Sequence, residues 1–236
     1  MREDLIKDIE FLSTGNNGSI AFARFADDAR PDRKMENDTV FLKSMLKAKK
    51  EDEFRLKSEV TDDLGITHKK FQQYYSGVKV DYAEYLLHGK NGNIEVMNGD
   101  YQNVAIPSIE PTLSEPQALS KALEYIGAEK YEWDEPMTKQ RMNDSDGTCC
   151  PKGELVIVKD YLTGSNAFKL SWKFFISSMK PFNRQLIYVD AINGDIIDDV
   201  SLLLDVNTPG TAQTRYSGTQ AITCDMSIPI LDGSLL

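Results

Sequence analysis

Histidine is scarce in this chain, with only His68 and His88 among 236 residues. A zinc peptidase of the His-Glu-x-x-His type needs two histidines one helical turn apart, so that both can reach one metal ion. The twenty-residue separation excludes that motif. The sequence also has no Gly-x-Ser-x-Gly, no phosphate-binding glycine loop and no dinucleotide-binding fingerprint. Both histidines fall in strand-like segments and could meet across a sheet, where packed or exposed histidines are commoner than metal ligands.

Cysteine is also sparse, since the chain has three. This number excludes a small scaffold built on disulfides. Cys149 and Cys150 are adjacent, which fits neither a redox motif nor zinc spacing. In an exported protein either could pair with Cys224 or with a cysteine outside this chain, and the pairing stays open. The nearby Asp144–Gly147 segment lacks the spaced ligands and closing glutamate of an EF-hand, so it is interpreted as a solvated loop.

Long apolar runs and an excess of positive charge are absent as well. Runs such as Ile187–Val189 are far too short to cross a bilayer, so we expect no membrane insertion. The formal net charge is −10, which disfavours nucleic acid as a partner because phosphate affinity depends on lysine and arginine. With 41% hydrophobic residues, the composition is typical of a globular protein with one or two domains.

The first half of the chain predicts a strand, a helix and an antiparallel meander. The strand covers 19–25, and a helix capped by Asn37 or Asp38 runs to Lys50. Residues then alternate with period two, and Asn91-Gly92 is a strong hairpin signal. The expected strands cover 53–60, 66–75, 78–88 and 93–97.

The second half repeats this arrangement. Ser114 and Gln117 form a capping box at the start of a helix that ends before Gly127. The expected apolar face of that helix consists of Ala118, Leu119, Ala122, Leu123 and Ile126. Four strands follow, within 154–160, 168–176, 185–190 and 195–201. The sequence therefore predicts an α+β fold with two antiparallel meanders, each packed with a helix, in cystatin-like or PepSY-like halves joined near 107–113.

One stretch resembles a known family. The segment from Leu64 to Val80, followed by a strand with the pattern Glu-x-x-x-His, is similar to the fungalysin/thermolysin propeptide motif. The residues that carry the resemblance are His68, Gln72, Gln73, Tyr75, Gly77, Val78, Val80, Glu84 and His88. One departure is Lys79, where the family often has proline, and both residues suit an extended strand.

Two further segments extend the resemblance. A leading helix and a closing Tyr-Val-Asp-Ala-x-x-Gly hairpin resemble a PepSY domain, with hairpin residues Tyr188, Val189, Asp190, Ala191 and Gly194. The segment from Gly210 is similar to the opening of the catalytic domain of thermolysin-like (M4) metallopeptidases. The expected divisions are an N-terminal extension (1–18), a propeptide-like domain (19–107), a PepSY-like domain (112–205), and a processing linker with a catalytic-domain stub (206–236).

The resemblance implies the prosegment of a secreted or cell-envelope zinc metallopeptidase. Such prosegments act as intramolecular chaperones and inhibitors, and their C-terminal stretch occupies the active-site cleft until autocleavage. The implied cleft-binding residues are Leu202, Leu203, Leu204, Asp205, Val206 and Asn207. The implied cleavage region is Asp205, Val206, Asn207, Thr208, Pro209 and Gly210, with apolar Val206 as a candidate for the position after the scissile bond.

The same resemblance implies what this chain does not do by itself. It would have no catalytic activity and no cofactor, while zinc and calcium would belong to the catalytic domain that lies beyond it. Its partner would be that cognate catalytic domain. We expect the chain to be a fragment that begins after a removed signal peptide. The alternative is a free-standing module of the same domains that inhibits another peptidase or binds envelope components. A His-Glu-x-x-His motif downstream in the reading frame would favour the prosegment.

Overall fold

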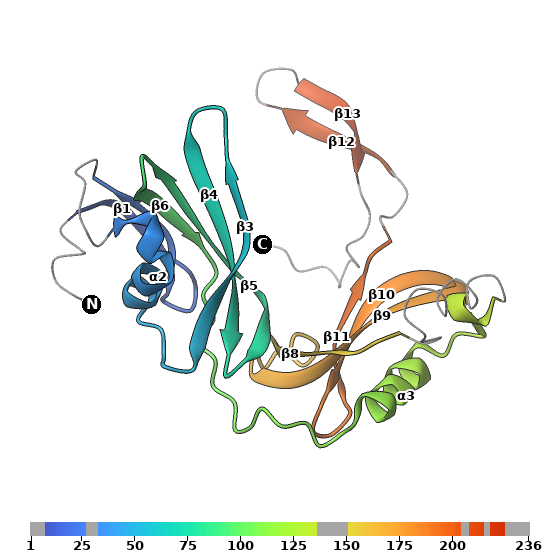
Figure 1. The fold of residues 1–236 in the computed structure, drawn as a ribbon. Coiled ribbons are helices and arrows are strands. Elements are labelled where there is room, and N and C mark those ends of the chain that lie inside the picture. The colour runs from blue at the N-terminus through green and yellow to red at the C-terminus, as the bar shows by residue number, and fades with distance from the viewer. Residues whose placement is uncertain (1–7, 27–32, 136–150, 204–207, 215–217, 225–236) are drawn as a thin grey trace. The chain divides into compact units, whose positions relative to one another are not determined.

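The computed structural model describes residues 8–26, 33–135, 151–203, 208–214 and 218–224 (Figure 1). The first part of the chain contains β1 (Ile9–Thr14), β2 (Ile20–Phe25), α2 (Asp38–Leu46), β3 (Asp52–Thr61), β4 (Ile66–Tyr75), β5 (Val78–Lys90) and β6 (Asn93–Gly99). The second part contains α3 (Glu115–Ile126), β7 (Lys130–Tyr131), β8 (Glu154–Lys159), β9 (Phe168–Lys180), β10 (Phe182–Asp190), β11 (Ile196–Ser201), β12 (Thr208–Thr214) and β13 (Gly218–Cys224). Short 3-10 turns cover Met35–Asn37 and Glu132–Asp134. Among the described residues, no helix has the length and apolar character needed to span a bilayer.

The mixed helix and strand content agrees with the sequence prediction, but the arrangement of the sheets differs. An 11-stranded sheet has the order β1-β2-β6-β5-β8-β9-β10-β11, with β3 and β4 continuing from β5 and β7 paired to β9. The expected division into two sheets is therefore wrong for these strands. The joint is a short parallel pairing of β5 with β8, where Lys79 lies opposite Val156 and Val80 opposite Ile157.

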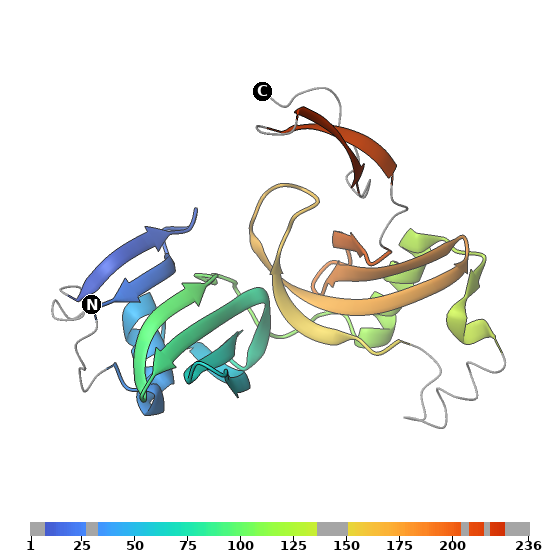
Figure 2. The ribbon, with the colours of Figure 1, turned by 90° about the horizontal axis from the view of Figure 1, so that it is seen from above.

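The chain divides into two compact units, each formed by several segments. The first contains residues 1–127, 151–174 and 187–198, and the second contains 128–150, 175–186 and 199–236. In the second unit, Lys130 and Tyr131 of β7 pair with the end of β9, and β12 pairs with β13 as a hairpin (Figure 2). The expected division at 107–112 stays a prediction.

The helix expected after Ser114 is present with its predicted ends. The Ser114 backbone N–H and hydroxyl both donate to Gln117 Oε1, at 2.9 and 2.8 Å, and this contact fixes the first turn. Gly127 ends the helix in the left-handed conformation, with φ +60°. On the predicted apolar face Ala118 and Ala122 are fully buried, whereas Leu119, Leu123 and Ile126 are half-buried.

Helix α2 ends earlier than predicted. Lys47 takes the left-handed conformation at φ 50°, and the following Ala48 N–H donates to Lys43 O. Lys49 N–H then donates to Asp52 Oδ2 at 2.8 Å, which turns the chain into β3. Residues 47–50, which the prediction included in the helix, therefore form the connection to the sheet.

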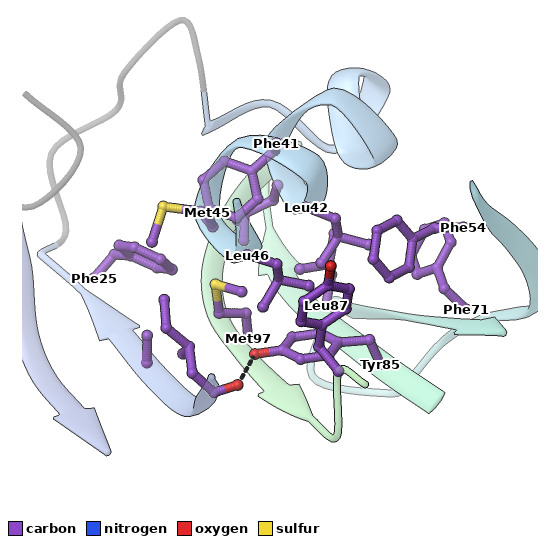
Figure 3. Packing of buried hydrophobic residues seen from close by; sticks show 14 of the residues in the cluster. Phe25, Phe41, Leu42, Met45, Leu46, Phe54, Phe71, Tyr85, Leu87 and Met97 are labelled. Carbon is purple, nitrogen blue, oxygen red and sulfur yellow. Dashed lines mark hydrogen bonds between the residues drawn. The ribbon is translucent and has the colours of Figure 1, made fainter. Parts of the chain in front are cut away.

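Helix α2 supplies one side of the main hydrophobic core (Figure 3). Its buried side chains pack against β2, β5 and β6, and the rings of Phe25 and Phe41 meet edge to face at 5.5 Å. The buried Tyr85 hydroxyl donates to Ile20 O at 2.7 Å, which joins β5 to β2. The helix contributes Phe41, Leu42, Met45 and Leu46 to this core.

Strand β1 was not predicted, because residues 9–14 show no clear alternation. It pairs with β2 at the edge of the sheet, and its register shifts twice within six residues. Phe11 and Leu12, which are consecutive, are both exposed. Because β1 is an edge strand with neither face buried, its apolar and polar residues need not alternate. Its register depends on the pairing with β2.

The α2 core generates a stability prediction. We expect Leu42→Ala to lower the free energy of unfolding by about 2–5 kcal/mol, because this fully buried side chain would leave a cavity. Val40→Ala on the same helix removes a side chain that is 69% exposed and should change stability by less than about 0.5 kcal/mol. Urea unfolding of both variants measures the difference, and equal effects would contradict this packing.

Candidate functional site

The propeptide-like motif is built around a distortion of β5. Gln72 lies opposite Glu84 and Tyr74 lies opposite Lys79. Between these two pairs β5 therefore has several more residues than β4. We call residues 80–83 the β5 bulge. Tyr82 within it has φ +59°, a conformation that is uncommon for a residue with a side chain. The bulge redirects β5 from β4 toward β8, with which Val80 pairs.

Gln72 fills the β5 bulge. Its side-chain amide donates to Val80 O at 2.6 Å and Ala83 O at 3.0 Å, with a third contact to Gln73 O at 3.2 Å. The residue is 6% exposed, so water does not replace these contacts freely. Gln72 therefore supplies the donors that carbonyl groups of the bulge lose when the strand ladder is interrupted.

Gln73 points to the opposite face and ties the sheet to the segment after β6. Its Nε2 donates to Asp52 Oδ1 at 2.9 Å and to Gln102 O at 2.8 Å, while its Oε1 accepts the Gln102 N–H at 2.9 Å. The Tyr101 hydroxyl donates to Asp52 Oδ2 at 2.7 Å. Burial and this carboxylate raise the pKa of Tyr101 above its ordinary value, so its proton stays in the network.

A second polar cluster occupies the other side of the β5 bulge. Asp81 Oδ2 accepts hydrogen bonds from Lys173 Nζ and the Tyr188 hydroxyl, both at 2.7 Å. Lys79 Nζ lies 3.4 Å from Asp81 Oδ1, and the Tyr82 hydroxyl lies 3.0 Å from that of Tyr188. Burial alone would raise the pKa of Asp81, but the two donors and the lysine charges outweigh it and hold the pKa below its usual range.

The two histidines meet on the outer face of the sheet. His68 of β4 lies directly opposite His88 of β5, with their Nδ1 atoms 2.6 Å apart. His68 Nε2 lies 3.2 Å from Asp62 Oδ2, and His88 Nε2 lies 2.9 Å from Asn98 Oδ1. Hydrogen bonds from the Ile66 backbone N–H and from His68 lower the pKa of Asp62. These four side chains form a continuous chain across β4, β5 and β6.

The remaining motif residues shape the hairpin. Glu84 binds Lys57 at 2.6 Å and also Lys70; burial raises the pKa of Glu84, and these two contacts outweigh it to give a lowered pKa. Gly77 has φ +83° in the two-residue turn between β4 and β5. Half-buried Tyr75 and Val78 flank that turn, and Val80 is fully buried beyond it.

The PepSY-like hairpin anchors the segment that precedes α3. Ala191 O accepts hydrogen bonds from the backbone N–H groups of Thr112 and Leu113, both at 2.9 Å. Asp190 is buried, accepts the Ile192 N–H at 2.9 Å and lies 3.0 Å from Lys169 Nζ. Val189 is buried beside it, and Gly194 turns the chain with φ +85°. A side chain at 194 would crowd Leu113, whose Cδ2 lies 3.3 Å from the ideal Cβ position.

The implied cleft-binding segment begins where β11 ends. The Leu202 N–H donates to Arg184 O at 2.7 Å and its side chain is 44% exposed, while Leu203 is half-buried. The other residues of that segment, 204–207, lie outside the described residues, as do Cys149 and Cys150. Thr208, Pro209 and Gly210 belong to β12, where they pair with Cys224, Thr223 and Ile222 of β13.

The described part of the chain brings together no group of three or more histidine, cysteine, aspartate or glutamate residues suited to a metal ion. The motif residues instead form hydrogen-bond networks on the two faces of one hairpin. Sequence reasoning missed Asp52, Asp81 and Lys173, which complete those networks. The available signal was the position of Asp81 between Val80 and Tyr82, where an acid in an apolar strand needs a partner.

Parts of this chain are similar to known proteins. Residues 52–101 match the model of the Fungalysin/Thermolysin Propeptide Motif. Bacillolysin of Bacillus amyloliquefaciens is 26% identical over 182 residues, which is 75% of this chain and 33% of that protein's length. The C-terminal domain of YpeB from Bacillus megaterium aligns with 79% of this chain and 73% of its own, at 16% identity and a TM-score of 0.34. The chain therefore carries a fungalysin/thermolysin propeptide motif, and its resemblance to the propeptide of a thermolysin-like protease is confirmed.

The contacts of Gln72 generate a second stability prediction. Gln72→Met keeps most of the side-chain volume but leaves Val80 O and Ala83 O without this donor, so we expect a loss of about 1–3 kcal/mol. Amide hydrogen exchange within the β5 bulge should quicken as well. Val60→Thr, at a side chain of β3 that is 61% exposed, serves as the control and should cost less than about 0.5 kcal/mol.

The lowered pKa of Asp81 predicts a dependence on pH. A carboxylate with a depressed pKa stabilises the fold above its unfolded pKa of about 3.9, and the contribution is lost as pH falls through the folded pKa. Asp81→Asn should therefore be less stable than the original chain at pH 7, with the difference shrinking below about pH 4. Urea unfolding across this range tests it, with exposed Asp63→Asn as control. A difference that stays constant with pH would contradict the role of the Asp81 charge.

Proposed function

We propose that this chain is the prosegment of a thermolysin-like zinc metallopeptidase, and that it acts as intramolecular chaperone and inhibitor of that enzyme. The observation that carries the proposal is the propeptide motif at 52–101, together with 26% identity to part of bacillolysin. The chain spans 33% of that relative's length.

The polar networks hold the folded sheet in place before any partner binds. This supports binding without a coupled folding step. Gln72, Gln73 and Asp81 each hold two or more partners within the sheet. A surface fixed in this way loses little conformational entropy on association. Because the catalytic domain would follow on the same chain, its effective concentration at that surface would be high.

The inhibitory segment in this proposal is Leu202–Asn207. An extended peptide can bind a peptidase cleft by adding a strand to it, and this segment continues directly from β11. Cleavage would fall between Asp205 and Gly210, with zinc and calcium held by the catalytic domain. In this proposal the precursor is exported, and the prosegment partner is its own catalytic domain.

Titration of the separately produced catalytic domain tests the mechanism. We expect the intact chain to bind it below micromolar concentration and to inhibit peptide hydrolysis. Val206→Asp should weaken inhibition at least tenfold, because a carboxylate is costly in an apolar pocket. Binding should weaken less, because the folded sheet of the chain still contacts the catalytic domain. Val206→Ile is the matched control and should inhibit like the original chain.

Two results would overturn this proposal. If the chain does not bind the catalytic domain at 10 μM, which corresponds to a binding free energy of about 7 kcal/mol, the alternative is favoured. That alternative is a free-standing module that acts on another peptidase or on envelope components. Equal inhibition by the Val206→Asp and Val206→Ile chains would exclude occupation of the cleft by this residue. Recovery of activity when the unfolded catalytic domain is refolded with and without the chain tests the chaperone role separately.

A further inference from the structure

Two exposed tyrosines meet at the β5 bulge. Tyr82 lies within the bulge, Tyr161 lies in the connection between β8 and β9, and their exposed fractions are 47% and 46%. The ring centroids are 6.2 Å apart and the ring planes meet at 72°, so an edge of one ring faces the other. We call this pair the aromatic corner. Because about half of each side chain is open to solvent, the pair leaves aromatic surface for a partner.

Contacts within the sheet hold both rings in place. The Tyr82 hydroxyl lies 3.0 Å from the hydroxyl of fully buried Tyr188, so one end of the exposed ring is anchored. The backbone N–H groups of Tyr161 and Leu162 both donate to Ile197 O at 3.2 Å, which joins the β8–β9 connection to β11. A partner would therefore meet aromatic surface that is already ordered, which lowers the entropy lost on binding.

Acidic residues lie near the aromatic corner. Asp198 directly follows the β11 carbonyl that holds the β8–β9 connection. The Asp100 N–H donates to Glu84 O at 3.0 Å, just beyond the bulge. Asp100 is exposed, and its Oδ2 accepts from the Gln102 amide, a neutral donor that leaves the carboxylate charge in place. Burial raises the pKa of Tyr161, and the charges of Asp198 and Asp100 raise it further.

The neighbouring Asp81 cluster shows how a cation fits such surroundings. Lys173 Nζ lies 2.7 Å from Asp81 Oδ2 and 5.4 Å from the centroid of the Tyr188 ring. A carboxylate and an aromatic ring thus stabilise one positive charge within the cluster. Tyr82 and Tyr161 offer the same two kinds of group at the surface, to a cation that comes from outside.

We propose that the aromatic corner and the carboxylates of Asp100 and Asp198 form a binding site for an arginine side chain of a partner protein. A guanidinium group suits this site because it is planar and weakly hydrated, stacks on aromatic rings and binds carboxylates through two N–H groups. The formal net charge of −10 also attracts a basic partner. Binding here needs only the folded sheet, so it does not depend on a peptidase as the partner.

Blocked amino-acid amides test the ligand on the full chain. N-acetyl-arginine amide presents its side chain as a protein does, and N-acetyl-citrulline amide has nearly the same shape without the charge. In an NMR titration the arginine amide should shift the ring signals of Tyr82 and Tyr161, and the citrulline amide should bind about fivefold more weakly or less. Raising the salt from about 0.1 M to about 1 M should weaken arginine binding, because the charges are partly exposed.

Two variants test the site, each with a matched control. Tyr161→Leu removes a ring but keeps an apolar side chain, and Asp100→Asn removes a charge but keeps a hydrogen-bond acceptor. Each should weaken binding of the arginine amide about threefold or more, with urea unfolding as the check that the chain still folds. Tyr125→Leu on α3, where the tyrosine is 50% exposed, and exposed Asp63→Asn should bind like the original chain.

Four outcomes would contradict this site. One is the absence of ring shifts up to about 20 mM arginine amide, which corresponds to less than about 3 kcal/mol of binding free energy. Another is equal binding of the arginine and citrulline amides, which would show that the charge is not recognised. A third is unchanged arginine binding by both the Tyr161→Leu and Asp100→Asn chains. The fourth is tighter binding of free arginine than of its blocked amide, which would indicate a site for the free amino acid instead of a protein partner.

Discussion

The carbonyl groups of the β5 bulge need hydrogen-bond donors, and the rest of the structure depends on how this need is met. Without Gln72, Val80 O and Ala83 O would lose the donor that replaces the interrupted ladder. With it, β5 can leave β4 and pair with β8, so that the 11-stranded sheet becomes continuous. The same bend directs Asp81 toward Lys173 and Tyr188, which compensate its charge.

This view gives the propeptide motif a physical meaning. Gln72 and Gln73 are adjacent and chemically identical, yet they serve opposite faces because side chains alternate along a strand. Gln72 closes the bulge, whereas Gln73 joins Asp52 of β3 to Gln102 after β6. The two glutamines of the motif therefore meet hydrogen-bond requirements at a bent hairpin. Such residues are specific because an apolar replacement would leave a buried group without a partner.

The sequence predicted local features well and non-local features poorly. The Ser114 cap and Gly127 define α3 within a few residues of chain, and the turn at Asn91-Gly92 sets the register of its hairpin through local dihedral preferences. The parallel pair between β5 and β8 joins segments about 75 residues apart, as the Lys79–Glu154 contact shows. No period or turn residue encodes that choice. The meeting of His68 and His88 was foreseen only as a possibility, because it depends on the exact register of β4 and β5.

The pairing of β5 with β8 also affects where local unfolding of this sheet can begin. Strand β5 carries the His68–His88 contact near one end and the bulge near the other, so both features lie on a single element. The His68 side chain is partly exposed, whereas the Gln72 contacts of the bulge are buried. Local unfolding would therefore begin at the histidine end of the β4–β5 hairpin, before it reaches the joint with β8. Local opening of this hairpin would expose Phe71 and Tyr85 of the α2 core, and the stability of that core sets how far the opening spreads.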